Sequence, residues 1–418
     1  MKPRRIAAGL SLLLCTVLSF TPALQQIVLF PEVIQQTTYQ QPPIPKLAPL
    51  ITLVQTDSRD SGDQRVVPAS QFRDVHVAYK LFGLFPLKNS EIQVMPALEL
   101  LPGGQSIGVS IQAKGVMVVG QAPIKDLEGK THLPGKEAGI EIGDVILKVE
   151  DKEVATDQDV ANAIHQAGEK RGIVDVLIKH RDQIVEKQVR PYFCRETGRY
   201  RIGLFVRDEA AGVGTLTFVD PVTKKYGALG HVINDADTNQ KIEVSNGKVI
   251  ASSIQSIEKG RKGHPGEKIG SFAANSGFCG TIEKNTAAGI FGVLNGEITN
   301  PYFQAPIPVG WTSEIKEGPA KIYTVVDGEK VEEFEVNIER IMPHRTDSKN
   351  MVIKVTDPRL IEMTGGIIQG MSGSPIVQNG KLVGAVTHVF VNDSLRGYGV
   401  FIQNMLKEAN MLAQKEAA

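Results

Sequence analysis

Apolar and polar residues change their spacing along the chain in a way that divides it into four parts. Residues 1–30 are mostly apolar after a short basic start, whereas residues 31–91 show no periodic apolar face. From 92 to 191, short apolar runs surround one helical pattern, and from 192 to 418 they alternate with Gly, Asn and Pro turns. The last pattern is typical of an antiparallel β-barrel or sandwich, so we expect a mainly β protein.

The N-terminal part has the arrangement of a secretory signal. Lys2, Arg4 and Arg5 precede the uncharged, mostly apolar segment 6–20. Because apolar residues continue to position 30, an uncleaved membrane anchor is an alternative. Residues 31–75 are rich in Gln, Thr and Pro and then in charged residues, which predicts an exposed linker that proteases can reach.

The part from 92 to 191 predicts a compact α+β domain. Two strands are expected over 106–112 and 115–121. Thr156 is a suitable N-cap for a helix over 157–168, and a hairpin should follow around residues 181–182. A helix between paired strands is enough to bury a small core.

The segment "AGIEIGDVILKVEDKEV", within this domain, resembles the PDZ domains of secreted bacterial proteases. The resemblance implies a groove that binds a peptide by β-augmentation, and the chain's own linker is one candidate for that peptide. The glycine-rich turn in "LPGGQSIGV" offers N–H groups that can hold a carboxylate. The residues expected to line the groove are Ile107, Gly108, Val109, Val160 and Ile164. The alternative is a small domain without a ligand.

Composition narrows the possible functions. Lys and Arg together number 46, as do Asp and Glu, so nothing favours a nucleic-acid surface. Cys194 and Cys279 allow either one disulfide or two separate thiols. No run of residues resembles a metal site, so we expect neither a metal nor another cofactor.

The stretch "GMSGSPIVQNGKLVGAV" resembles the nucleophile segment of chymotrypsin-like serine proteases, which implies a double β-barrel with a C-terminal helix. A nucleophilic hydroxyl must be exposed on a sharp turn, and glycines permit that turn. Ser372 is then the nucleophile, and the N–H groups of Gly370 and Ser372 form the oxyanion hole. Met371 replaces the aspartate that zymogen-type relatives pair with a new N-terminus. The alternative is a glycine turn with an incidental serine.

Serine needs a base and a group that orients it. His231, in "GALGHVINDADT", follows a strand and precedes the serine, so it is the favoured base. Asp357 directly follows an apolar strand and is the favoured carboxylate. The other carboxylates considered are Asp235, Asp237 and Asp327.

The order of anchor, linker, PDZ domain and peptidase resembles the stage IV sporulation protein B family over essentially the whole chain. The resemblance implies that His231, Asp357 and Ser372 are catalytic and that residues 40–75 are a self-cleavage zone. It also implies a signalling peptidase that crosses the forespore membrane into the intermembrane space. There it cuts a membrane-bound regulator, which activates intramembrane processing of a sigma factor.

Two other functions remain open from the sequence. One is an HtrA-like quality-control protease of broad specificity, and the other is a catalytically inactive, secreted PDZ scaffold. Activity on unfolded protein would distinguish the first, and failure to react with a serine-directed probe would distinguish the second. The predicted boundaries are 1–30 for the signal or anchor, 31–91 for the linker, 92–191 for the PDZ domain and 192–418 for the peptidase.

Overall fold

The structure is a computed structural model that describes residues 33–36, 51–56, 75–81, 84–181, 183–272 and 277–412. They fall into two compact units, each described by itself. The first runs to Leu98 and includes Val309–Ile315, and the second comprises the rest of the chain from Glu99. The predicted signal or anchor, 1–30, lies outside the described residues. Within those residues, no helix is long and apolar enough to cross a membrane.

The first unit contains a four-stranded sheet in the order β1-β4-β3-β2. Its strands are β1 (Val33–Gln36), β2 (Ile51–Thr56), β3 (Val75–Leu81) and β4 (Phe85–Val94). The linker predicted over 31–91 therefore contains paired strands, which is a difference from the expected exposed chain. The turn η1 (Thr312–Glu314) also belongs to this unit.

The second unit contains a first barrel of six strands that closes because β6 pairs with both β17 and β15. In pairing order the strands are β6 (Ser106–Gln121), β17 (Val244–Glu258), β19 (Phe278–Thr281), β21 (Gly289–Gly296), β16 (Lys225–Ala228) and β15 (Leu204–Val219). The strands at its margins are β5 (Glu99–Pro102), β18 (Glu267–Phe272), β20 (Lys284–Thr286) and β22 (Ile307–Pro308). Its core includes Leu216, Tyr226 and Ile290.

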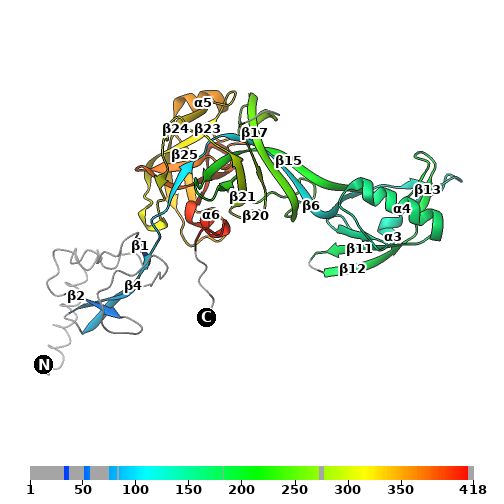
Figure 1. The fold of residues 1–418 in the computed structure, drawn as a ribbon, viewed down its shortest axis with the longest axis horizontal. Coiled ribbons are helices and arrows are strands. Elements are labelled where there is room, and N and C mark those ends of the chain that lie inside the picture. Colours follow the sequence, from blue (N-terminus) through cyan, green and yellow to red (C-terminus); the bar gives the residue numbers. More distant parts are fainter. Residues whose placement is uncertain are drawn as a thin grey trace, which may run out of the picture. The chain divides into compact units, whose positions relative to one another are not determined.

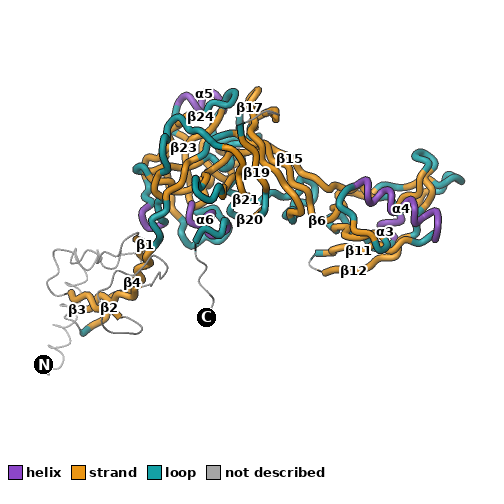
Figure 2. Tube along the Cα trace, viewed as in Figure 1, coloured by secondary structure: helices purple, strands orange, loops and turns teal. Residues whose placement is uncertain are grey.

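A second closed barrel follows in the order β23-β24-β25-β28-β27-β26. Its strands are β23 (Gly318–Val325), β24 (Val331–Ile341), β25 (Met351–Val355), β26 (Pro375–Gln378), β27 (Lys381–Phe390) and β28 (Asp393–Phe401). Two helices accompany it, α5 (Pro358–Thr364) and α6 (Ile402–Glu408). The predicted chymotrypsin-like double barrel with a C-terminal helix is confirmed, and strands dominate the described chain (Figure 2).

The PDZ domain is a small sheet covered by one long helix. Its elements are β7 (Ile124–Lys125), β8 (Thr131–His132), α3 (Pro134–Glu137), β9 (Val145–Val149), β10 (Lys152–Glu153), α4 (Asp157–Arg171), β11 (Val174–His180), β12 (Gln183–Val189), β13 (Tyr192–Cys194) and β14 (Arg199–Arg201). Thr156 caps α4 as predicted, through a capping box with Asp159. The expected hairpin is also present, because β11 pairs with β12.

The PDZ domain is inserted into the first barrel instead of preceding it. The first half of β6 pairs in the barrel, and its second half pairs with β9 in the PDZ domain. The strand β15 returns along the same path, so two long strands join the two domains (Figure 1). The sequence predicted two strands here, separated by Ala113-Lys114, whereas β6 runs through both. Gly115 has a φ of +88°, a conformation that glycine adopts without strain, and the strand continues through it.

The two described cysteines do not form a disulfide. Cys194 is a buried free thiol in β13, and Cys279 is an exposed free thiol in β19 of the first barrel. Of the two possibilities left open by the sequence, the structure supports separate thiols. Neither residue therefore staples the PDZ domain to the barrel.

Candidate active site

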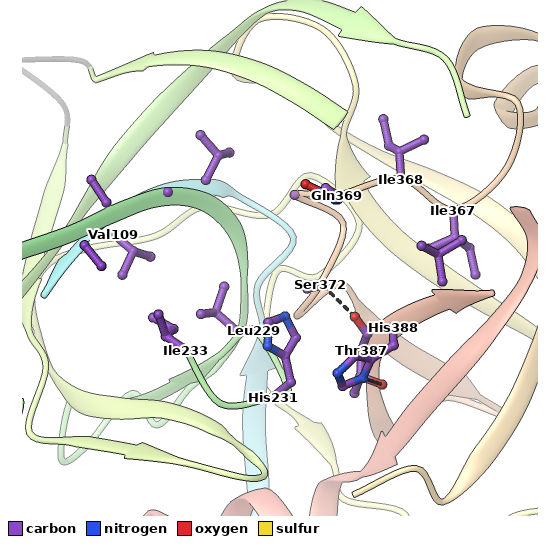
Figure 3. Close-up of a pocket in the computed structure, with 16 residues that line it drawn as sticks. Val109, Leu229, His231, Ile233, Ile367, Ile368, Gln369, Ser372, Thr387 and His388 are labelled. Atoms are coloured by element: carbon purple, nitrogen blue, oxygen red, sulfur yellow. Dashed lines mark hydrogen bonds between the residues drawn. The ribbon is translucent and has the colours of Figure 1, made fainter. Parts of the chain in front are cut away.

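A cleft of about 370 Å³ is lined by residues of both barrels (Figure 3). The first barrel contributes Val109, Ala210, Ala211, Gly212, Val213, Leu229, His231 and Ile233. The second contributes Ile367, Ile368, Gln369, Gly370, Ser372, Thr387, His388 and Val389. The predicted nucleophile, both predicted oxyanion donors and the predicted base therefore line one cleft. Its lining is largely apolar and carries no carboxylate.

Ser372 lies on a sharp turn that leads into β26. Gly373 has a φ of +95°, and a Cβ atom there would lie 2.0 Å from the carbonyl oxygen of Thr215, so only glycine fits. Two hydroxyl groups of β15 hold the turn. Thr215 Oγ1 donates to the carbonyl of Gly370 at 2.7 Å, and Thr217 Oγ1 donates to that of Gly373 at 2.7 Å. The first barrel thus fixes the turn that presents the serine.

Hydrogen bonds to two carbonyls orient the peptide planes that carry the predicted oxyanion donors. The carbonyl of Gln369 accepts from the N–H of Lys268 at 3.0 Å. The carbonyl of Met371 accepts from the N–H of Ser374 at 2.9 Å and from its hydroxyl at 2.6 Å. In a trans peptide the N–H points opposite to the carbonyl, so the N–H groups of Gly370 and Ser372 point away from these donors. Neither bonds to any part of the chain that the structure describes.

The Ser372 hydroxyl is not yet aimed at the base. Its Oγ donates to the carbonyl of Thr387 at 2.5 Å (Figure 3). A rotation about the Cα–Cβ bond would free it, and staggered alternatives are always close in energy for serine. Catalytic hydrogen bonds are often absent before substrate binds, so this geometry leaves the pairing with His231 open to substrate-induced rotation.

His231 is held in the tautomer that a general base needs. Its Nδ1 lies 2.7 Å from the carbonyl oxygen of Val232, which can only accept, so the proton resides on Nδ1. Nε2 therefore carries the free lone pair. Burial lowers the pKa of His231 below its usual value, which keeps the ring neutral at neutral pH. A neutral imidazole with a free Nε2 is competent to accept a proton from serine.

A second histidine, His388, lies against His231 in the cleft. The ring centroids are 4.9 Å apart and the planes are tilted by 44° (Figure 3). Burial, followed by the charge on a protonated His231, lowers the pKa of His388 to about 4. His388 lies on β27, the second strand of the hairpin that follows Ser372, and was not among the predicted site residues.

The structure does not bring Asp357 to the base. Asp357 caps α5, accepting from the N–H of Arg359 at 2.9 Å and from that of Glu335 at 3.3 Å. Its carboxylate also lies 3.2 Å from the Arg359 guanidinium. Burial alone would raise the pKa of Asp357, but these donors outweigh it and the pKa falls below its usual value. The placement corrects the predicted contact with His231, because an Asp-Pro after a strand also suits a helix start.

The other candidate carboxylates also lie outside the cleft lining. Asp235 and Asp237 both pair with Arg207, at 3.0 and 2.7 Å. Asp327 is likewise not among the cleft residues. Across the described ranges, no cluster of His, Cys, Asp and Glu side chains has the arrangement of a metal site.

We expect Asp357→Ala to lower stability by about 1–2 kcal/mol, because it removes a helix cap and a partly buried ion pair. The measurement is urea unfolding of both proteins. Activity should then be compared per folded molecule, with Asp357→Asn as the isosteric control. Full loss of activity in a folded Asp357→Asn protein would mean that Asp357 reaches His231 in another conformation.

The residues predicted to form the PDZ groove do not lie together. Ile107 and Val109 are buried in the core of the first barrel, and Gly108 packs beneath the ring of Phe272. The prediction for these residues is wrong because the strand that contains them pairs with β15 and β17 of the barrel. Val109 lines the cleft near Ser372 instead.

Val160 and Ile164 do belong to the PDZ domain, where α4 buries them in its core. The same cluster includes Ile202, and Leu204 and Val206 pack against it. The start of β15 packs against the same core as α4, and within the described chain it pairs on one side only, with β6. The strand β14 lies against α4 itself, because the N–H of Tyr200 donates to Nδ1 of His165 at 3.4 Å. The missed signal is "RIGLFV", an Ile-Gly step before an apolar strand like the one in "SIGV".

Comparison with known proteins agrees with this architecture. Residues 198–406 match the family model described as SpoIVB peptidase S55, and residues 127–177 match a PDZ domain model. No curated protein matches the chain.

Several solved structures are similar at low identity. The active form of the Rv3671c protease from M. tuberculosis is 14% identical, covers 50% of this chain and 78% of its own, and gives a TM-score of 0.27. The protease Anisep from Arthrobacter nicotinovorans is 15% identical, covers 48% and 90%, and gives 0.30. The PDZ domain of the SdrC-like protein from Listeria monocytogenes is 22% identical, covers 22% and 87%, and gives 0.18.

Proposed function

The chain belongs to the SpoIVB peptidase S55 family, and we propose that it is a secreted signalling peptidase of sporulation. It is a serine endopeptidase with a PDZ domain. In the proposed role it crosses the forespore membrane, held at least transiently by its N-terminal segment, and acts in the intermembrane space. It trims its own linker within residues 40–75. It then cuts a membrane-bound regulator and so activates intramembrane processing of a sigma factor.

The observation that carries the catalytic part is the shared cleft of Ser372 and His231. When substrate enters, the Ser372 hydroxyl turns from Thr387 to Nε2 of His231. The histidine takes the proton as Oγ attacks the scissile carbonyl, and the developing oxyanion is bound by the N–H groups of Gly370 and Ser372. The protonated histidine gives its proton to the leaving amine, and water then hydrolyses the acyl-enzyme.

The positive charge that forms on His231 is stabilised less here than in a triad, because no carboxylate of the described residues contacts its Nδ1. The carbonyl of Val232 fixes the orientation and tautomer of His231, but it carries only a partial negative charge. The neutral ring of His388 adds contact without a full charge. A modest catalytic rate follows, which suits a peptidase that cuts few bonds in a signalling event.

The signalling role is tested with purified protein and two substrates. We expect cleavage of the membrane-bound regulator at a few defined sites and little digestion of unfolded casein. Each product should be absent when Ser372→Ala protein replaces the wild type. Extensive digestion of casein would favour a quality-control protease instead.

The PDZ domain is proposed to present a peptide by pairing it with the start of β15 beside α4. We expect Ala161→Trp, which enlarges a half-buried position one turn before His165 on the side of α4 that faces Tyr200 of β14, to weaken binding of a peptide with the linker sequence by about tenfold or more. Fluorescence anisotropy measures this directly. The control is Gln166→Trp on the exposed face of the same helix. Equal binding by both variants would place the peptide elsewhere.

A further inference from the structure

A lysine is buried beneath the nucleophile turn without a carboxylate partner. Lys268 lies on β18 and is 4% exposed. Its Nζ bonds to Thr324 Oγ1 at 2.7 Å and to Thr215 Oγ1 at 3.5 Å. Both threonines are fully buried. No acidic side chain in the described chain lies within ion-pair distance of Nζ, and burial lowers its pKa to about 7.

The Lys268 side chain runs directly under Gly370. A Cβ atom at Gly370 would lie 3.0 to 3.1 Å from Cβ, Cγ and Cδ of the lysine. The hydroxyl of Thr215 uses its proton to bind the carbonyl of Gly370 at 2.7 Å, so it accepts from Nζ. The amine, the hydroxyl and the carbonyl therefore form a continuous hydrogen-bonded chain. This chain ends at the Gly370–Met371 peptide, which directly follows the N–H of Gly370, the first predicted oxyanion donor.

The main chain of Lys268 fixes the peptide on the other side of Gly370. Its N–H donates to the carbonyl of Gln369 at 3.0 Å, and the N–H of Gln369 donates to the carbonyl of Gly266 at 2.7 Å. Rotation of the Gln369–Gly370 peptide would turn the Gly370 N–H away from the cleft. Lys268 thus restrains the peptide planes on both sides of Gly370. The main-chain N–H holds the Gln369–Gly370 plane, and the side chain acts through Thr215 on the Gly370–Met371 plane.

Met371 cannot anchor the turn by an ion pair, so another group must hold it. Met371 is fully buried and apolar, at the place where an aspartate would otherwise anchor the turn through an ion pair. A buried amine without a counter-charge is expensive to maintain, and such groups are found mainly where they serve function. The cost of Lys268 therefore calls for a role other than stability.

We propose that Lys268 is a positioning residue that, with Thr215, keeps the Gly370 N–H directed into the cleft. The inference rests on Ser372 as the proposed nucleophile. The hydrogen-bonded chain from Lys268 through Thr215 takes the place of the ion pair that Met371 cannot form. Lys268 itself does not touch the substrate, so its effect is on the rate of acylation more than on substrate binding.

The test is Lys268→Met, which keeps side-chain length and removes the donor, and Thr215→Val, which breaks the chain one step later. We expect each to lower kcat by about 10- to 100-fold with little change in KM, since complete removal of an oxyanion donor costs about 10²- to 10³-fold and a misplaced donor loses part of that effect. The double variant should be no worse than the more impaired single variant. The melting temperature of Lys268→Met should stay equal or rise, because a buried charge is replaced by an apolar chain.

Two controls make the outcome decisive. Lys259→Met removes a lysine whose Nζ bonds at the surface to the carbonyl of Glu362, and it should leave kcat unchanged. A fluorophosphonate probe should label the wild type but not Ser372→Ala, and it should label Lys268→Met more slowly. An unlabelled wild type would refute the proposed nucleophile. A labelled wild type with equal labelling of Lys268→Met, or a kcat loss matched by a lower melting temperature, would overturn the inference.

Discussion

Ser372→Ala should abolish peptidase activity, with a fall in kcat of about 10⁵- to 10⁶-fold, as expected when a nucleophile is removed from a serine protease. The residual rate would come from the oxyanion hole and substrate binding alone. The fold should be intact, because the lost hydroxyl makes a single bond, to the carbonyl of Thr387. The measurement is hydrolysis of a peptide ester together with the melting temperature.

The neighbouring serine provides the matched control. Ser374 is fully buried and its hydroxyl donates to the carbonyl of Met371, so it cannot reach a substrate. Ser374→Ala should therefore keep covalent labelling and lose at most about 1 kcal/mol of stability from the missing hydrogen bond. Labelling that depends on Ser374 instead of Ser372 would reassign the nucleophile within "GMSGSP".

The same Ser372→Ala protein tests self-processing. If the linker is a substrate, the wild type should be trimmed within residues 40–75 and the variant should stay long when their N-termini are mapped. Identical trimming of both would assign the cut to another protease. Identical trimming together with an unreactive wild type would favour an inactive PDZ scaffold.

The turn at Ser372 and the hairpin after it could be predicted from local patterns, because the residues that shape them are adjacent in the sequence. The glycines on either side of Ser372 are needed by the turn itself, and the hairpin that follows is fixed by Asn379-Gly380, both at positive φ. The same holds for α4, whose start is determined by Thr156 and whose apolar positions recur at helical spacing. Both elements are determined by interactions between residues that are close in the sequence, so the sequence alone predicts them.

The insertion of the PDZ domain was not predictable in this way. Whether residues 106–113 belong to the PDZ domain or to the barrel depends on which distant strands pair with them. The pairings of Ile107 with Gly214 and Ala251 join residues that are 107 and 144 positions apart in the sequence, and nothing in a local window encodes them. For the same reason the start of β15, which packs against the same core as α4, was assigned to the peptidase.

Asp357 shows a different limit of sequence analysis. A carboxylate at the end of a strand and before a proline satisfies the pattern of a helix cap and that of a catalytic group equally well. Only the position of His231 decides between them, and the structure places His388 beside that ring instead. The residues that the sequence singled out, Ser372 and His231, therefore lie in one cleft, but the surroundings of the His231 ring were not predicted.

His231→Ala should lower kcat about as much as loss of the serine, by roughly 10⁵- to 10⁶-fold, because the two residues act as one unit. The pH dependence identifies the base. Since the pKa of His231 is lowered, its neutral form persists at neutral pH, and wild-type kcat/KM should fall only as pH drops through that lowered pKa. His388→Gln should keep this acid limb, whereas the residual activity of His231→Ala should lack it. An acid limb that disappears in His388→Gln and survives in His231→Ala would make His388 the base, since its Nε2 would then have to accept the Ser372 proton.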